Sequence, residues 1–297
     1  MRTEDGVLLH VEVDEAPDAD VTVVFSHGFT AELGEFLLQR EALRGRARVV
    51  LYDQRGHGRS ERTHYEHATI DQLGRDLQAV LDATCPTGPV VLVGHSMGGM
   101  TLMSWARQFP GEVGNRVVGA FLLATSAGDL VTGGPLGAAV RLMTRLRLLG
   151  LWLWLIRALS PAVARVRRPG TRLGYRWVRH YLFGTDDADD PDLVRLVQAM
   201  LEATDFRTSA AFYPTFLTHD ETASLPVLAR IPTTVLCGTA DRLTPVSHSR
   251  ALAAVLGDVL VEVPGCGHSV NVTRPELVND ALRTLLDRAA LRARAAG

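Results

Sequence analysis

The feature that most constrains the fold is a junction between an apolar run and a helical pattern at residues 89–109. The run Pro-Val-Val-Leu-Val-Gly ends at Gly94, and Gly-His-Ser-Met-Gly occupies 94–98. At a sharp turn from a strand into a helix, neighbouring backbone passes very close. The positions two before and two after the central serine must then be tiny. The junction predicts a strand–turn–helix unit that presents Ser96 at the carboxyl end of its strand.

The same alternation of apolar runs and helical patterns recurs along the chain. Strands are expected at 7–13, 20–25, 48–53, 89–94, 117–125, 233–238 and 259–264, and helices at 35–44, 69–82, 96–109, 247–256 and 275–290. Unbroken Val/Leu strands that alternate with helices predict a parallel sheet covered on both faces. The two leading strands have little chain between them, which predicts an antiparallel edge.

The alternation stops over residues 126–225, where only helical patterns occur. We therefore expect a core domain made of 1–125 and 226–297 and a helical cap, or lid, made of 126–225. Proline marks the helix ends inside this cap: we expect helix starts at Ser160-Pro161 and Asp190-Pro191, and a stop at Pro169-Gly170.

Three side chains point to nucleophilic catalysis. A serine hydroxyl needs a base within hydrogen-bond reach and a carboxylate that orients the base. Asp241 follows the strand at 233–238, and His268 follows the strand at 259–264. Both loops lie at the carboxyl ends of strands, on the same rim of the sheet as Ser96. We expect Ser96, Asp241 and His268 to be the catalytic residues.

Alternatives exist for the acid and the base. Asp258 is a rival acid, and the competing histidines are His10, His57, His64, His67, His95, His180, His219 and His248. The side chain of His95 must point away from that of its neighbour Ser96. The reaction also needs two N–H groups that bind the developing oxyanion, and we expect them at Met97 and at Phe29, after the His27-Gly28 turn. Losing one such donor costs roughly 10²–10³ in rate.

Five segments together resemble the α/β-hydrolase superfamily, and specifically its capped serine esterases and lipase-like members of the monoacylglycerol lipase and lysophospholipase type. They are Ser-His-Gly-Phe-Thr at 26–30, Asp-Gln-Arg-Gly-His-Gly-Arg-Ser at 53–60, Gly-His-Ser-Met-Gly-Gly at 94–99, Gly-Thr-Ala-Asp-Arg-Leu-Thr-Pro at 238–245 and Gly-Cys-Gly-His-Ser at 265–269. The resemblance implies an α/β fold with an eight-stranded, mostly parallel sheet, and a helical cap inserted after strand 6.

The same resemblance implies a Ser96–Asp241–His268 triad, a nucleophile elbow that includes Gly94, His95 and Gly98, and neither a metal nor an organic cofactor. It implies only a structural role for the loop that holds Asp53, Arg55 and His57. Members with this triad also act as carbon–carbon bond hydrolases, enol-lactonases, acyltransferases and lyases or cyclases, and some relatives only bind ligands. The fold does not choose among these.

The predicted cap has an unusual charge. Residues 130–185 contain no Asp or Glu, ten arginines and three of the four tryptophans. The segment 148–156 is apolar on all sides of a helix, so it must be buried or meet lipid, and it is too short to cross a bilayer. Three interpretations remain: a lid packed on the core, a surface for anionic lipid, or a partner such as a carrier protein or coenzyme A thioester. Each predicts an apolar pocket for a medium or long acyl chain, and hence a small-molecule ester substrate.

The remaining composition narrows the environment. The formal net charge is −2, which gives no reason to expect a nucleic acid partner. Three cysteines, Cys85, Cys237 and Cys266, imply no disulfide framework. No signal-like apolar core stands near residue 1. We expect a cytoplasmic protein, and the sequence does not indicate its oligomeric state.

Overall fold

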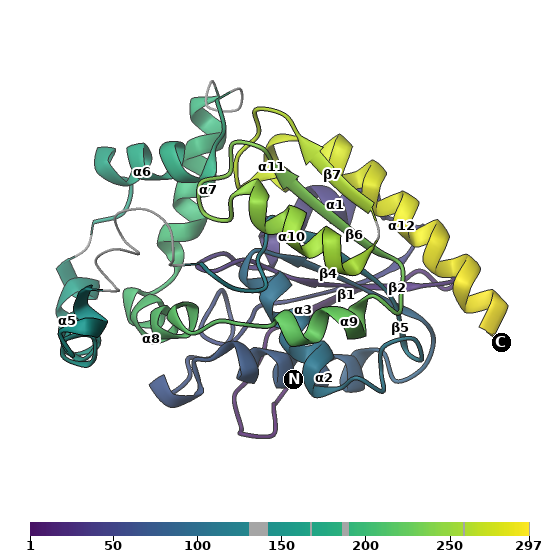
Figure 1. The fold of residues 1–297 in the computed structure, drawn as a ribbon, viewed down its shortest axis with the longest axis horizontal. Helices are drawn as coiled ribbons and strands as arrows, with labels where there is room; N and C mark the ends of the chain where they lie inside the picture. Colours follow the sequence, from purple (N-terminus) through teal and green to yellow (C-terminus); the bar gives the residue numbers. More distant parts are fainter. Residues whose placement is uncertain (131–141, 167, 186–189, 258, 297) are drawn as a thin grey trace.

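A single mixed sheet organises the molecule. The computed structural model describes residues 1–130, 142–166, 168–185, 190–257 and 259–296. Within them, seven strands are ordered β1-β3-β2-β4-β5-β6-β7, with β1 antiparallel to β3 and every other neighbour parallel. Their bounds are β1 Val11–Asp14, β2 Thr22–Ser26, β3 Arg48–Tyr52, β4 Val90–His95, β5 Val117–Leu123, β6 Thr233–Gly238 and β7 Val259–Val263. Figure 1 shows this sheet edge-on between two layers of helices.

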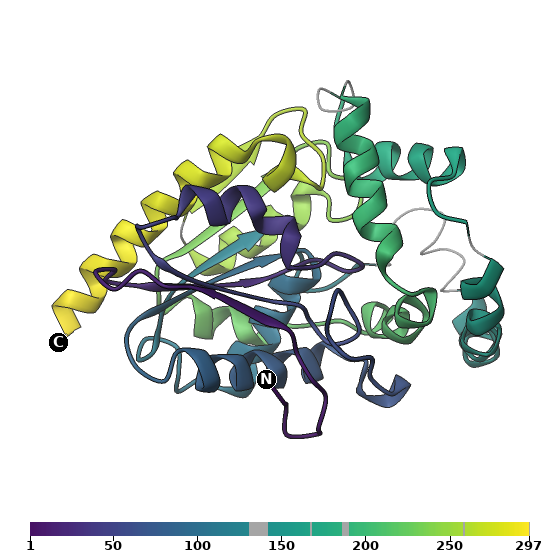
Figure 2. The ribbon, with the colours of Figure 1, turned by 180° about the vertical axis from the view of Figure 1, so that it is seen from behind.

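Both faces of the sheet are buried, which explains the unbroken apolar runs. Alternate residues of one strand face opposite sides, so in β4 Leu92 joins one core cluster while Val91 and Val93 join the other. The first cluster is covered by α2 (Ile70–Thr84), α3 (Met97–Gln108), α9 (Leu225–Leu228) and α10 (Val246–Leu256). The second is covered by α1 (Leu37–Ala42) and α12 (Pro275–Ala296), as Figures 1 and 2 show from two sides.

The predicted α/β architecture is confirmed, with three differences of detail. The sheet has seven strands in the described residues, whereas the resemblance implied eight. The expected strand at 7–13 begins only at Val11, and before it Leu8 pairs with Arg2 through an isolated bridge. The helix expected at 35–44 is a 3₁₀ turn, η1 (Leu33–Phe36), followed by α1. Short 3₁₀ turns also form η2 (Tyr65–His67) and η3 (Thr222–Ser224).

Four longer helices and then α9 connect β5 to β6, so the insertion follows the fifth strand of this sheet, whereas the resemblance implied that it follows strand 6. The four are α5 (Leu149–Val166), α6 (Arg172–Leu182), α7 (Pro191–Ala203) and α8 (Phe206–Leu217), and we call them the inserted helices. They gather at one end of the molecule, opposite the end where α12 finishes (Figures 1 and 2). The Asp190 carboxylate accepts the N–H groups of Asp192 and Leu193 at 3.0 Å, which is the predicted cap of α7.

The predicted helix start at Ser160-Pro161 is wrong, because both residues lie inside α5. Proline has no N–H, so at position 161 it cannot donate to the carbonyl of Arg157. The Ser160 hydroxyl donates to that carbonyl instead, at 2.8 Å, and α5 continues for 18 residues in all. By length and composition, α5 is a helix that could cross a membrane; it is the only such helix among the described residues.

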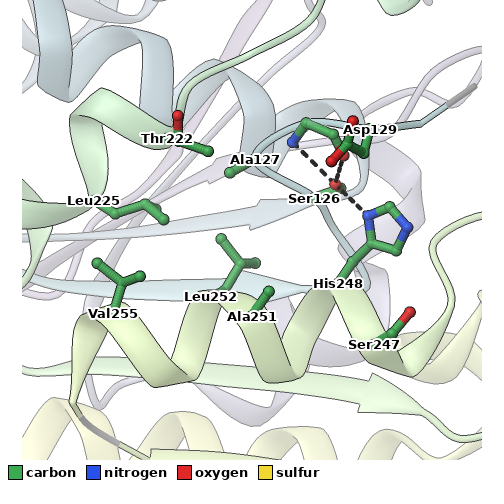
Figure 3. Close-up of a pocket in the computed structure, with 11 residues that line it drawn as sticks. Ser126, Ala127, Asp129, Thr222, Leu225, Ser247, His248, Ala251, Leu252 and Val255 are labelled. Carbon is green, nitrogen blue, oxygen red and sulfur yellow. Dashed lines mark hydrogen bonds between the residues drawn. The ribbon is translucent and has the colours of Figure 1, made fainter. Parts of the chain in front are cut away.

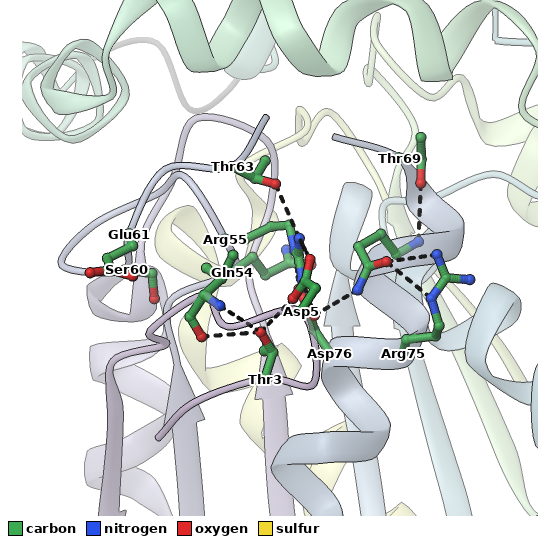
Figure 4. A network of polar contacts seen from close by, with 12 residues as sticks. Thr3, Asp5, Gln54, Arg55, Ser60, Glu61, Thr63, Thr69, Arg75 and Asp76 are labelled. Atoms are coloured by element: carbon green, nitrogen blue, oxygen red, sulfur yellow. Dashed lines mark hydrogen bonds and ion pairs between the residues drawn. The ribbon is translucent and has the colours of Figure 1, made fainter. Parts of the chain in front are cut away.

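A buried arginine fastens the loop after β3. Arg55 is fully buried; its Nε and Nη2 donate to the Asp76 carboxylate on α2 at 2.5 Å, and its Nη atoms donate to Asp5 at 2.8 and 3.0 Å (Figure 4). Hydrogen bonds from Arg55 lower the pKa of Asp5, whereas burial raises the pKa of Asp76. The network joins the first residues of the chain, this loop and α2, beneath the rim where the strands end.

Candidate active site

Ser96 stands at a strained turn between β4 and α3. Its backbone has φ 51° and ψ −116°, a region that side chains with a Cβ rarely adopt, so the surroundings must hold it there. The N–H of Ser96 donates to the carbonyl of Leu123 at 2.9 Å, and its own carbonyl accepts the Thr125 hydroxyl at 2.7 Å. The end of β5 therefore fixes the turn from both sides.

Two glycines leave the space that this turn needs. A Cβ at Gly98 would lie 1.8 Å from the carbonyl oxygen of Ser26, and a Cβ at Gly94 would lie 2.6 Å from the backbone of Gly98. Neither neighbour can move, because both are backbone. Any larger residue at these positions would force β2, β4 and α3 apart.

His268 and Asp241 form a hydrogen-bonded pair. The Nδ1 of His268 lies 2.7 Å from Oδ2 of Asp241, and both side chains are buried. The other carboxylate oxygen accepts the N–H groups of Leu243 and Thr244 at 2.8 and 2.9 Å. Burial alone would raise the pKa of Asp241, but the facing imidazole and these donors lower it below its usual value. The carboxylate is thus ionised and accepts the Nδ1 proton of His268.

Ser96 and His268 line one cavity of about 220 Å³. Among the described residues no hydrogen bond joins them, an arrangement common in free enzymes whose catalytic contacts tighten on substrate binding. The cavity wall is largely apolar, with contributions from Phe29, Met100, Leu130, Trp177, Leu182, Leu201, Tyr213, Phe216, Leu217 and Leu243. None of His10, His57, His64, His67, His180, His219 and His248 reaches it, and Asp258 lies outside the described residues.

Of the two expected oxyanion donors, Met97 follows Ser96 in the chain, and Phe29 lines the same cavity as Ser96. The N–H groups of Phe29 and Met97 have no hydrogen-bond acceptor within the described part of the chain. The turn before Phe29 is held by His27, whose Nε2 accepts the N–H of Gln54 at 2.9 Å, so its Nδ1 donates to the carbonyl of Gly28 at 2.8 Å. Burial lowers the pKa of His27, which keeps this tautomer neutral.

A second buried carboxylate–imidazole pair stands behind the serine, and the sequence analysis did not identify it. Glu35 Oε1 lies 2.9 Å from His95 Nδ1, and Glu35 Oε2 accepts the N–H of Gly28 at 2.8 Å. His95 Nε2 donates to the carbonyl of His268 at 3.1 Å. Burial disfavours the charged form of both groups. Their mutual attraction nevertheless raises the pKa of His95 and lowers the pKa of Glu35. The pair thereby links the turn at Gly28, the serine turn and the loop of His268.

One signal in the sequence could have indicated this pair. Glu35 interrupts the apolar pattern Leu-Gly-Glu-Phe-Leu-Leu at 33–38 and is buried, as Phe36 is. An acid at an inward position needs a cationic partner, and His95, next to Ser96, was one of the histidines already placed at the same rim.

The loop of His268 is also in contact with the inserted helices. The N–H of Ser269 donates to the carbonyl of Leu182 at 3.0 Å, at the end of α6. A Cβ at Gly184 would lie 1.9 Å from the carbonyl oxygen of Gly265, and a Cβ at Gly267 would lie 2.5 Å from the backbone of Gly184. Two backbone segments pack together here without side chains between them.

Another serine–histidine contact lies in a separate pocket of about 350 Å³ between the end of β5 and α10 (Figure 3). Ser126 Oγ is 2.6 Å from His248 Nδ1, but its proton is donated to the carbonyl of Gly128. His248 therefore donates to Ser126, and it has no carboxylate partner in the described residues. This arrangement does not activate the hydroxyl. The described residues also contain no cluster of His, Cys, Asp or Glu suited to a metal ion.

Comparisons with known proteins show the family and the fold. A sequence model described as the alpha/beta hydrolase family matches residues 23–281. RutD of Caulobacter sp. strain K31, a provisional carbamate hydrolase by its name, is 29% identical over 96% of this chain and 97% of its own. An esterase from Thermogutta terrifontis superposes with a TM-score of 0.76, at 24% identity over 97% of this chain and 96% of its own. The enol-lactonase from Burkholderia xenovorans LB400 gives 0.72, at 24% identity over 95% and 97%.

Proposed function

The chain belongs to the alpha/beta hydrolase family, and from that premise we propose that it cleaves carboxylic esters with an apolar acyl group through an acyl-enzyme intermediate. The observation that carries the proposal is the Asp241–His268 pair at 2.7 Å, which faces the same apolar cavity as the strained Ser96. Ser96 is the nucleophile, His268 the general base and acid, and Asp241 the group that orients His268.

The reaction proceeds in two halves. Ser96 Oγ attacks the ester carbonyl while Nε2 of His268 takes the hydroxyl proton, and His268 then returns that proton to the leaving alcohol. Water next attacks the acyl-enzyme and loses a proton to His268, which donates that proton to Ser96 Oγ as the bond to the acyl group breaks and the acid leaves. The ionised Asp241 holds the imidazole with its proton on Nδ1 and stabilises the imidazolium that forms in each half.

The N–H groups of Phe29 and Met97 bind the oxyanion of the tetrahedral intermediate. Both lack an internal acceptor in the described residues, so both are available for a ligand oxygen. A buried N–H without a partner is costly, and a negative oxygen that develops at this point would remove that cost during the reaction. Gly94, His95 and Gly98 complete the nucleophile elbow.

The cavity wall supports an apolar acyl group. Trp177, Leu182, Leu201, Tyr213 and Phe216 reach it from the inserted helices, which supports residues 126–225 as a cap over a core of 1–125 and 226–297. A volume of about 220 Å³ is below the roughly 300–1,000 Å³ of typical ligand pockets, which favours a medium acyl chain. The excess of arginine in the cap makes an anionic lipid surface its expected neighbour.

The three cysteines support a reducing compartment. Cys85, Cys237 and Cys266 are all free and buried. Burial raises the pKa of Cys85 and of Cys237, which keeps both as unreactive thiols. We therefore place the protein in the cytoplasm.

A panel of p-nitrophenyl esters tests the function. The decanoate should be cleaved with a higher kcat/KM than the acetate, because only the longer chain fills the apolar cavity. A clear preference for the acetate would contradict the acyl assignment. Labelling by a fluorophosphonate probe, measured in parallel, reports whether a nucleophilic serine is present at all.

The names of two relatives suggest two further test substrates. A carbamate and an enol-lactone, each offered under the same conditions, test the chemistry named for RutD and for the Burkholderia enzyme. Turnover of either one without turnover of any acyl ester would keep the triad and replace the ester reaction.

A further inference from the structure

One face of α5 is exposed and wholly apolar. Between Leu151 and Val163, every exposed side chain of this helix is apolar. Trp154 is 62% exposed and Leu159 57% exposed. We call this the outer face of α5. Contiguous apolar surface on a folded protein marks a place where something else binds.

The opposite face fixes the orientation of the helix. The Trp152 ring packs edge-on against Tyr213 of α8, with centroids 5.6 Å apart. The guanidinium of Arg157 lies 5.2 Å from the centre of the Tyr65 ring, and the Ser160 hydroxyl is 3.1 Å from the Tyr65 hydroxyl. These contacts hold α5 against the rest of the molecule, so the outer face stays turned outward.

Positive charge stands at both ends of the outer face. Arg145 and Arg147 precede α5, Arg165 and Arg168 lie at and beyond its end, and all four are exposed. None of the four forms an ion pair with an acidic residue among those described. An apolar strip with arginine at its ends suits a surface that offers hydrocarbon below and anionic groups above.

We propose that the outer face of α5 docks in the plane of an anionic phospholipid bilayer. An in-plane position fits better than a spanning one, because Arg157 and Ser160 tie the middle of the helix to Tyr65. A second copy of this chain is a poorer occupant, because pairing through the same face would bring the arginines of both copies together.

Docking would also narrow the class of substrate, and this step rests on the proposed function. Trp177 of α6 is 48% exposed and lines the cavity that holds Ser96, and Leu173, one turn earlier, is 78% exposed. Both α5 and α6 lie at the same end of the molecule (Figures 1 and 2). An acyl chain delivered at this end meets Trp177 before it meets Ser96, so acyl chains of membrane lipids are the substrate class that the surface selects.

Vesicle sedimentation with the full-length Ser96→Ala chain tests the docking surface without any turnover. We expect it to sediment with vesicles of phosphatidylcholine mixed with phosphatidylglycerol, and much less with phosphatidylcholine alone or in high salt. The double substitution Trp154→Ser and Leu159→Ser should lower partitioning at least about tenfold. The matched control Leu291→Ser, on α12 at the opposite end, should leave it unchanged; Leu291 is 67% exposed.

A second set of measurements tests the role of the arginines and the alternative that the outer face of α5 pairs with a second copy of the chain. Changing Arg145, Arg147, Arg165 and Arg168 together to Gln should reduce binding to the anionic vesicles, whereas Arg292→Gln should not. Failure to sediment, or equal sedimentation of the Trp154/Leu159 variant, would overturn the proposal. So would a dimer in light scattering that disappears with that variant. Hydrolysis of a soluble ester by the Ser96-containing chain is measured separately, so a failed docking surface and a failed active site are told apart.

Discussion

Two serine–histidine pairs among the described residues differ in what holds the hydroxyl and the imidazole. Ser126 and His248 are 2.6 Å apart in an open pocket, where the serine proton is already donated to the carbonyl of Gly128. Ser96 and His268 have no hydrogen bond between them, yet His268 is held by an ionised carboxylate and Ser96 by a strained turn.

The difference shows that a short distance does not make a nucleophile. A hydroxyl becomes reactive when its proton is free to leave, when the base has its acceptor nitrogen turned toward it, and when donors await the oxyanion. In the function that we propose, Ser96 meets these conditions through Asp241, Met97 and Phe29. Ser126 does not, because its proton is donated to the carbonyl of Gly128. Mutations at the two sites can therefore test whether these features separate the two serines.

The largest effect is expected from the nucleophile. Ser96→Ala should lower kcat for ester cleavage by roughly 10⁶-fold, the scale seen when a triad serine is removed, and should abolish fluorophosphonate labelling. Ser126→Ala is the matched control and should keep both within a small factor. Persistent labelling of the Ser96→Ala chain would show that another residue is the nucleophile. Loss of activity in Ser126→Ala would show that Ser126 and His248 take part in the reaction.

The carboxylate comes next. Asp241→Asn should lower kcat by about 10⁴-fold, because an amide can donate to Nδ1 and so favour the wrong imidazole tautomer. Circular dichroism should show an unchanged fold. Because the pKa of Asp241 lies below its ordinary value of 3.8, protonation of this carboxyl should not lower the wild-type rate at any pH above that value. An Asp241→Asn chain with nearly full activity would remove the feature that separates the two sites.

The smallest effect on rate, but a large one on stability, is expected at Glu35. Glu35→Gln leaves the buried His95 without its counter-charge, and breaking such a pair costs up to about 3–5 kcal/mol. Glu35 has a lowered pKa, so its contribution is present above its ordinary value of 4.5 and is lost as pH falls through the folded value. His95 has a raised pKa, so its contribution is present below 6.5 and is lost as pH rises through the folded value.

The stability difference between wild type and Glu35→Gln should therefore be greatest between pH 4.5 and 6.5 and should narrow on either side. Urea unfolding across this range measures it, with Glu32→Gln in the same loop as control. A difference that does not change with pH would show that the pair acts by packing alone.

The sheet was predictable because its signals are local. The apolar run at 89–94 predicts a strand buried on both faces. Gly94 and Gly98 are needed because neighbouring backbone passes too close to the turn at Ser96 for any larger residue. The Asp190 cap was equally predictable, since its side chain accepts the N–H groups two and three residues ahead.

Other features depend on residues far apart in the chain. Ser160-Pro161 has the pattern of a helix start, yet the hydroxyl replaces the missing backbone donor and the helix continues. Glu35 and His95 are 60 positions apart, and only the fold brings them together. Whether the apolar segment at 148–156 would be buried or exposed was likewise decided by how α5 packs on α8, where the Trp152 ring contacts Tyr213.

The close packing of Gly184 on Gly265 and Gly267 has a practical consequence for engineering. The segment after α6 rests directly on the backbone that carries His268, with Ser269 bonded across the seam. Replacing the helices between β5 and β6 with those of a relative would therefore also change the contacts of the His268 loop. The new segment would need a glycine that packs directly on the backbone of Gly265 and Gly267. Without it, the imidazole of His268 would move from the position that the proposed chemistry requires.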